Sequence, residues 1–332
     1  MRTAWSVLAG VMLLGGLSAA QQGSVHLEAG RGQRPFDVTK HSVPIEELHG
    51  GGPPRDGIPA IDHPKFVPAA NARFLRGNDR VLGVNHNGVA KAYPIGILNW
   101  HEIVNDDFAG KPVAVTWCPL CVSGIVYDPQ IEKKKLTFGV SGKLYKSALV
   151  MYDRETESLW SQIMQQAITG PLTGTKLVMI PAQHTTWDDW RRRHPETLVL
   201  SPDTGHKRDY GLNPYQRYWE GDEPGFRNPK DAEAARKRHS LRPMERVLGV
   251  EVNGLHKAYP FPMLKRKAPQ FQDMLAEKTV RVHFDPRSEN AWITDEEGTA
   301  LPSVTTFWFA WTDFYPDSLV FKNHEDGNGK SQ

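Results

Sequence analysis

A large net charge of either sign is missing from this 332-residue sequence, whose formal net charge is +2. A nearly balanced chain gives no electrostatic sign of binding to a nucleic-acid backbone or to an anionic membrane surface. We therefore expect a small molecule or a metal ion as the partner, and no nucleic acid. Composition leaves open whether the protein is an enzyme and what its oligomeric state is.

The sequence contains one long apolar run, near its N-terminus, and lacks a second. The run from Trp5 to Leu17 follows Arg2 and precedes Ser-Ala-Ala at 18–20, a pattern typical of a secretory signal peptide cut after Ala20. A retained membrane anchor is the alternative, but the run is shorter than the ~20 apolar residues that a spanning helix needs. No cysteine lies near the cut, which argues against a lipid-anchored lipoprotein. We expect a mature chain without a membrane span in an extracytoplasmic (periplasmic or secreted) location.

Glycine, proline and tryptophan, by contrast, are plentiful, with 29, 25 and ten residues respectively. This mixture favours many short strands joined by turns over long helices. We predict a β-dominated α+β fold with antiparallel sheets and a few short helices.

The sequence contains one unit twice. RVLGVNHNGVAKAYP at 80–94 recurs as RVLGVEVNGLHKAYP at 246–260, and both segments predict a hairpin with Asn-Gly as its turn. KPVAVTWCP at 111–119 aligns with KTVRVHFDP at 278–286. An internal duplication of this kind predicts two related lobes packed side by side.

The duplication divides the chain into predicted segments. These are a signal peptide (1–20), a Gly/Pro-rich segment (21–79), a first copy (80–201), a connecting loop segment (202–245), a degenerate second copy (246–322) and a disordered tail (323–332). Within the connecting segment, Lys230–Arg238 is a candidate charged helix.

Two cysteines stand between predicted strands of the first copy. An alternating, β-rich stretch leads into Cys118-Pro-Leu-Cys121, and another apolar stretch follows at 124–128. The pair therefore lies at a predicted hairpin tip, whereas the redox Cys-x-x-Cys of thioredoxin-like proteins opens a helix. A knuckle that holds a metal ion between two thiolates fits this context better.

His101 is the predicted third ligand of this metal site. Two thiolates, one imidazole and an open position suit copper or zinc. Weaker ligand candidates are Glu102, Asp128 and Met151. Three alternatives use the same residues or none of them: a metal-free thiol–disulfide oxidoreductase, a cysteine nucleophile activated by His101, and a non-catalytic scaffold with an inert disulfide.

The second copy lacks all three ligand candidates. The alignment places Asp285 at the position of Cys118, Ser288 at that of Cys121, and Lys267 near that of His101. Their joint replacement indicates a shared role in the first copy.

Residues 138–162 belong to the first copy alone. They are dense in polar and aromatic side chains, and they predict a pocket wall formed by Tyr145, Asp153, Arg154 and Gln162. The alternative is a hairpin in which Asp153 caps a turn while Arg154 stays solvated.

Trp187 and Trp190 lie on a short candidate helix that begins at Thr185. Both recur in the second copy as Trp308 and Trp311. Their recurrence predicts a role in core packing.

Several of these motifs together resemble a known family. HEIVND, VTWCPLC, SGxLYxSxLVMYDRxTxSLWSQ, GGPPRDGIPAID and the DTG at 203–205 are similar to the family catalogued as domain of unknown function 3179. The resemblance spans roughly residues 35–322. It implies an exported bacterial or archaeal protein and implies no particular activity.

Overall fold

The computed structural model describes residues 24–225, 233 and 241–322. The predicted signal peptide and the predicted tail lie outside these residues, as does the predicted helix Lys230–Arg238 apart from residue 233. No helix within the described residues has the length and apolar character needed to cross a bilayer.

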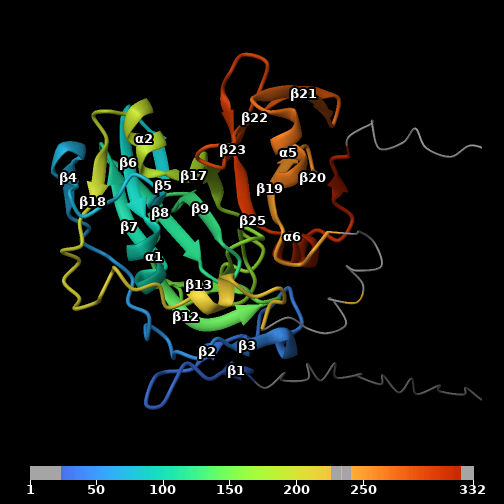
Figure 1. Ribbon diagram of the computed structural model, residues 1–332. Helices are drawn as coiled ribbons and strands as arrows, with labels where there is room; N and C mark the ends of the chain where they lie inside the picture. The colour runs from blue at the N-terminus through green and yellow to red at the C-terminus, as the bar shows by residue number, and fades with distance from the viewer. Residues whose placement is uncertain (1–23, 226–232, 234–240, 323–332) are drawn as a thin grey trace, which may run out of the picture.

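The fold is β-dominated, with antiparallel sheets and short helices, as predicted. Five larger sheets are arranged as the blades of a propeller (Figure 1), so the prediction of two related lobes packed side by side is wrong. Strand β9 of the first copy packs beside β25 of the second, and β17 of the first packs beside β23 of the second. Because the copies bury these strands against each other, they share one centre.

Two blades are formed mainly by the first copy. One has the strand order β17-β5-β6-β18-β4 and the other β16-β9-β8-β7. Their bounds are β4 Phe66–Pro68, β5 Arg80–His86, β6 Val89–Pro94, β7 Ile103–Phe108, β8 Lys111–Cys118, β9 Ser123–Asp128, β16 Val178–Ile180, β17 Ala182–Thr186 and β18 Leu198–Leu200.

The second copy repeats this topology. Its blades have the orders β25-β19-β20-β26 and β21-β22-β23-β24, and β20 pairs with β26 in parallel, as β6 does with β18. Their bounds are β19 Arg246–Val252, β20 Leu255–Pro260, β21 Gln270–Leu275, β22 Lys278–Asp285, β23 Asn290–Thr294, β24 Ala300–Leu301, β25 Ser303–Phe307 and β26 Leu319–Val320.

The fifth blade comes from the residues that only the first copy contains. Its order is β15-β14-β13-β12-β3, so a strand of the N-terminal segment completes it. The bounds are β3 Leu48–Gly50, β12 Phe138–Tyr145, β13 Ala148–Asp153, β14 Leu159–Ser161 and β15 Gln166–Ala167. Two small hairpins complete the strands: β1 His26–Leu27 with β2 Phe36–Asp37, and β10 Gln130–Ile131 with β11 Lys134–Lys135.

The helices are short, and most occupy corresponding places in the two copies. In each copy one helix follows the first hairpin and another follows the β17 or β25 strand. Their bounds are α1 Ile95–His101, α2 Trp187–Arg193, α3 Gln216–Trp219, α5 Phe261–Lys267 and α6 Trp308–Phe314, with 3₁₀ turns η1 Ile45–Glu47 and η2 Ala69–Asn71. Helix α2 begins one residue later than its predicted start implies, because Thr186 is the residue whose side chain caps it, accepting from the N–H of Asp189.

The repeated Asn-Gly pairs form the predicted turns. Asn87 and Gly88 have φ of 49° and 76°, and Asn253 and Gly254 have φ of 51° and 79°. Two positive φ values in succession match the twist of a two-residue hairpin.

A second repeated feature is a glycine beneath a tryptophan. A Cβ added at Gly83 would stand 2.2 Å from the Trp190 ring, and one at Gly249 would stand 2.2 Å from the Trp311 ring. All four tryptophans of the two Trp-x-x-Trp blocks are buried. Core packing is therefore the reason that Trp187 and Trp190 recur, as predicted.

Candidate functional site

The two cysteines lie at the tip of the β8–β9 hairpin, as predicted. Cys118 ends β8, and the N–H of Cys121 donates to the Cys118 carbonyl at 3.2 Å. Val122 then takes a φ of 55°, which returns the chain to β9. The tight turn places both side chains on the same short loop.

Both thiols are free and buried, with exposed fractions of 1% for Cys118 and 0% for Cys121. Burial opposes ionisation of Cys118, but the neighbouring Cys121 thiol and the nearby backbone N–H groups of Leu149, Cys121 and Leu120 favour the thiolate. The pKa of Cys118 is therefore below its ordinary value. Burial and the neighbouring Cys118 raise the pKa of Cys121 well above its ordinary value. The pair thus favours a Cys118 thiolate beside a protonated Cys121.

The blade that only the first copy contains supplies part of this environment. Leu149 lies on β13, and the Cys121 thiol donates to the Ser147 carbonyl at 3.5 Å. Gln162 donates to Thr116 Oγ1 at 2.9 Å and accepts from Ser123 Oγ at 3.0 Å, which braces the hairpin below the cysteines. The insertion and the cysteine pair therefore form one structural unit.

Glu102 provides a buried carboxyl group next to Cys118. Burial, and then the charge of Cys118, raise the pKa of Glu102 well above its ordinary value, while a hydrogen bond from Tyr215 at 3.4 Å partly offsets this. These effects favour the protonated carboxyl group, which can donate a proton near the thiolate.

The segment around α3 covers the cysteine loop. Trp219 Nε1 donates to the Pro119 carbonyl at 2.8 Å, and the Trp219 ring packs edge-on against Trp117. The Tyr218 hydroxyl is buried without a hydrogen-bond partner among the described residues. Burial and the charges of the two cysteines raise the Tyr218 pKa, so its hydroxyl stays neutral near the sulfurs.

The second copy contacts the same loop from another side. Thr306 Oγ1 and the Phe307 N–H both donate to the Cys121 carbonyl at 2.9 Å. The equivalent loop of the second copy turns in the same way, because Glu289, which aligns with Val122, has a φ of 47°. In this loop Ser288 Oγ donates to Asp285 at 2.8 Å. Asp285 and Ser288 thus stand in space where the alignment places them.

His101 ends α1, but its ring is bound elsewhere. Nδ1 lies 2.7 Å from the Pro59 carbonyl, to which it donates, and Nε2 accepts from the Tyr210 hydroxyl at 2.7 Å. Glu102 follows with a φ of 57° and ends the helix, so the chain turns between these two residues. The residue that interacts with Cys118 is therefore Glu102, whereas both ring nitrogens of His101 already have partners.

No group of three or more His, Cys, Asp and Glu side chains that could hold a metal ion occurs within the described ranges. Cys118 and Cys121 are brought together, and His101 does not join them. Of the weaker candidates, Asp128 caps a turn by accepting from the Gln130 N–H at 2.9 Å, and Met151 is buried on β13.

The predicted pocket wall is dispersed. Asp153 is buried and accepts from Trp160 Nε1 at 2.8 Å and from the Thr156 N–H at 2.6 Å, which matches the turn-capping alternative. Arg154 pairs with Asp62 at 2.6 Å in a partly exposed position. Tyr145 is buried and stacks edge-on against Phe314. Of the four, Gln162 braces the cysteine hairpin.

The family model described as Protein of unknown function (DUF3179) matches residues 55–318. The chain belongs to this family. The DUF3179 match includes the cysteine hairpin, the inserted blade, the connecting segment and nearly all of the second copy. Neither a curated protein nor a solved structure matches the chain.

The sequence did not predict the residues that cover the cysteine pair of this chain. Tyr215, Tyr218 and Trp219 lie in the segment interpreted as a connecting loop. The available signal was their clustering, because three aromatic residues within five positions are unusual in a polar connecting segment.

The ring of His101 gives a prediction about acid stability. Burial, with smaller effects of His206 and Arg208, lowers the His101 pKa to about 4, although the bond to Pro59 opposes this. In the unfolded chain a histidine has an ordinary pKa of ~6.5, so between pH 6.5 and 4 the unfolded state binds more protons than the folded state. Acidification through this window should therefore lower the free energy of unfolding by up to about 3 kcal/mol. Urea unfolding at pH 7 and pH 4.5 should show a smaller loss in His101→Gln than in the natural protein. An identical loss in both proteins would contradict this assignment.

Proposed function

We propose that Cys118 and Cys121 form a redox-active dithiol that reduces a small oxidant of the peroxide class. The observation that supports it is the placement of two free, buried thiols on one hairpin turn. The pKa of Cys118 lies below its ordinary value and that of Cys121 lies above it, which favours ionisation of Cys118 first. A thiolate with a neighbouring protonated thiol is the arrangement needed for nucleophilic attack followed by disulfide closure.

The reaction balances with the groups present. The Cys118 thiolate attacks one peroxide oxygen, the O–O bond breaks, and Glu102 gives its proton to the leaving alkoxide or hydroxide. Cys118 becomes a sulfenic acid. The Cys121 sulfur then attacks the Cys118 sulfur, water leaves with the Cys121 proton, and the disulfide forms.

Burial supports a small substrate. Exposed fractions of 0–1% at the two sulfurs leave no room for docking another protein's disulfide. A peroxide needs only local opening of the Tyr215–Trp219 cover. The signal-like N-terminus supports an extracytoplasmic location, where oxidants and disulfides are ordinary.

The roles of the two cysteines can be separated with single variants. The reduced protein, treated with hydrogen peroxide and analysed by intact and peptide mass spectrometry, should form an intramolecular disulfide. Cys121→Ser should stop at a sulfenic acid on Cys118 that dimedone captures, and Cys118→Ser should give no dimedone adduct. Equal dimedone labelling of the two single variants would overturn the assignment of Cys118 as the nucleophile.

A soft monovalent metal ion is a second candidate ligand of the same pair. The hairpin geometry favours this candidate, because it places two sulfurs together beside backbone N–H groups. Thiolates select copper(I), whereas the four ligands usual for structural zinc are not assembled in the described part of the chain. Elemental analysis of protein purified without chelators separates the candidates, because stoichiometric copper lost in Cys118→Ser would favour metal handling over peroxide reduction.

A further inference from the structure

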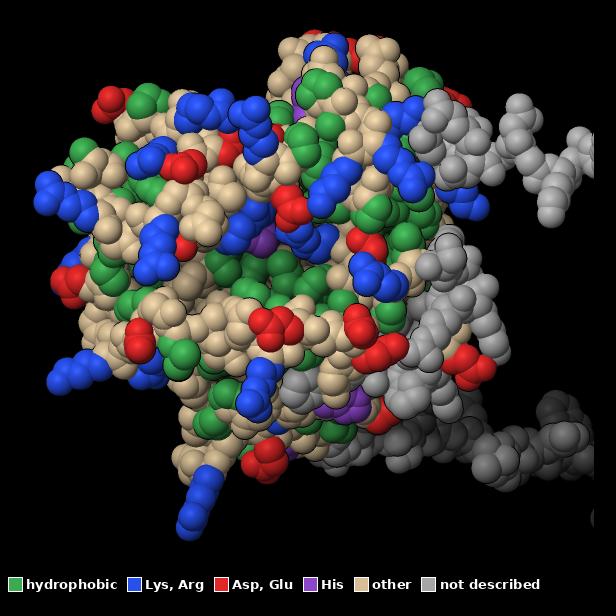
Figure 2. Space-filling view, viewed as in Figure 1, with side chains coloured by type: hydrophobic (Ala, Val, Ile, Leu, Met, Phe, Trp, Pro, Cys, Tyr) green, Lys and Arg blue, Asp and Glu red, His purple; other side chains and the backbone are tan. Residues whose placement is uncertain are grey.

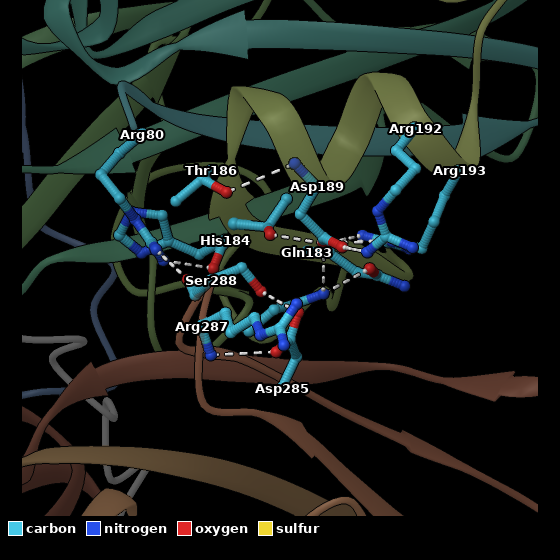
Figure 3. A network of polar contacts seen from close by, with 12 residues as sticks. Arg80, Gln183, His184, Thr186, Asp189, Arg192, Arg193, Asp285, Arg287 and Ser288 are labelled. Atoms are coloured by element: carbon cyan, nitrogen blue, oxygen red, sulfur yellow. Dashed lines mark hydrogen bonds and ion pairs between the residues drawn. The ribbon is translucent and has the colours of Figure 1, made fainter. Parts of the chain in front are cut away.

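A separate polar cluster lies between β5, β17 and the β22–β23 turn (Figure 3). Arg80 begins β5, and its guanidinium donates to the carbonyls of Ser288 and His184. The Arg80 Nε is buried without a hydrogen-bond partner among the described residues. None of these groups takes part in the cysteine chemistry.

Positive charge exceeds negative charge around Arg80. Its counterpart in the second copy, Arg246, shares Glu289 with Lys265, whereas Arg80 forms no ion pair within the described ranges. Burial lowers the Arg80 pKa to about 10, and the charge of Arg246 contributes, while Glu289 and Asp189 oppose the shift only in part. Asp189 is itself paired with two arginines of α2. An anion beside Arg80 would relieve this excess.

His184 adds a second unsatisfied group. Its exposed fraction is 7%, and neither ring nitrogen has a hydrogen-bond partner among the described residues. Burial and the charges of Arg80 and Arg246 lower its pKa well below the ordinary value, so the imidazole is neutral. A neutral imidazole has one donor and one acceptor. Leaving a buried polar group unsatisfied is energetically unfavourable, which indicates that something else binds here.

Arg80 also lines a pocket of about 460 Å³ whose other walls combine apolar side chains with the charged Arg76 and Asp79. Ile97 of α1 and Trp219 of the α3 segment belong to these walls, and so do Phe74, Leu75, Ile95 and Leu212. On the face drawn in Figure 2, Lys or Arg side chains and a histidine surround a hollow with hydrophobic side chains at its base. Two arginines against one carboxylate, with apolar side chains beside them, suit an amphipathic anion.

We propose that this pocket binds a small organic carboxylate. The two carbonyl acceptors leave the Nε–H of Arg80 and further guanidinium N–H groups for a bidentate carboxylate. His184 is not a lining residue of the pocket, but its backbone carbonyl accepts from Arg80, and we assign its ring N–H to the same carboxylate. The apolar part of the ligand packs against Ile97 and Trp219. Inorganic phosphate is also an anion, but it has no apolar part to pack against the apolar walls of the pocket.

Calorimetric titration of the full-length protein with phenylacetate, acetate and inorganic phosphate tests this assignment. Phenylacetate should bind most tightly. Its Kd should rise at least tenfold in Arg80→Gln and stay unchanged in Arg191→Gln, which removes an equal charge from an exposed surface pair. Tighter binding of phosphate, absence of any binding, or equal affinity in Arg80→Gln would each overturn the proposal.

His184→Leu provides a variant that should remain folded. It removes both unsatisfied nitrogens, so its thermal stability should equal or exceed that of the natural protein. Its phenylacetate affinity should fall at least threefold. A stable His184→Leu protein with unchanged affinity would show that the imidazole has no part in the site.

Discussion

Replacing Glu102 by glutamine should slow the oxidation of Cys118 by hydrogen peroxide about 100-fold, the lower range for loss of a general acid. The glutamine amide would be neutral and could still accept a hydrogen bond from the Tyr215 hydroxyl. It has no acidic proton to give to the leaving oxygen. Burial and the nearby Cys118 raise the pKa of the Glu102 carboxyl well above its ordinary value and so favour its protonated form. The rate can be followed by quenched time points and mass spectrometry of the Cys118 peptide.

Two controls separate this loss from damage to the fold. Glu296→Gln makes the same chemical change at an exposed turn and should leave the rate unchanged. Thermal unfolding of Glu102→Gln should stay close to that of the natural protein. An unchanged oxidation rate in a folded Glu102→Gln protein would show that the leaving oxygen takes its proton from another source.

Adding one methyl group at Gly83 or Gly249 should destabilise the propeller strongly. The new Cβ would stand 2.2 Å from the ring of Trp190 or Trp311, both of which are buried in a closely packed core. Because the ring has no space into which it can move, we expect each Gly→Ala variant to lose about 3 kcal/mol of unfolding free energy. Urea denaturation measures this loss.

Gly50→Ala is the matched control for both variants. Gly50 also lies in a strand, but a Cβ there would meet nothing within 4 Å. Its change in unfolding free energy should stay within about 0.5 kcal/mol. Similar losses in all three variants would show that general strand propensity is responsible and that contact with the tryptophans is not.

The duplication was readable in the sequence because local signals recur in the same order. The Asn-Gly turns at 87–88 and 253–254 need a positive φ wherever they occur, and the glycine of RVLGV is required beneath a tryptophan. These constraints depend on residues close in sequence or on one repeated contact. They therefore predicted both hairpins and the matching of Cys118 with Asp285.

The arrangement of the blades was not readable in the same way. It depends on pairings between distant strands, such as β3 with β12 and β18 with β4, for which short strands carry little information. The site shows the same limit. His101 and Glu102 are neighbours, but the positive φ of Glu102 decides which one interacts with Cys118. Tyr218 and Trp219 reach the cysteine loop across about 100 residues of chain.

The most direct test of the central claim is a redox titration of the folded protein. The protein would be equilibrated with graded ratios of reduced and oxidised dithiothreitol, quenched with acid, alkylated and analysed by peptide mass spectrometry. A redox-active pair predicts one two-electron transition between free thiols and a Cys118–Cys121 disulfide, with the protein folded in both states. Thiols that remain reduced at every ratio, or that oxidise only after unfolding, would contradict it.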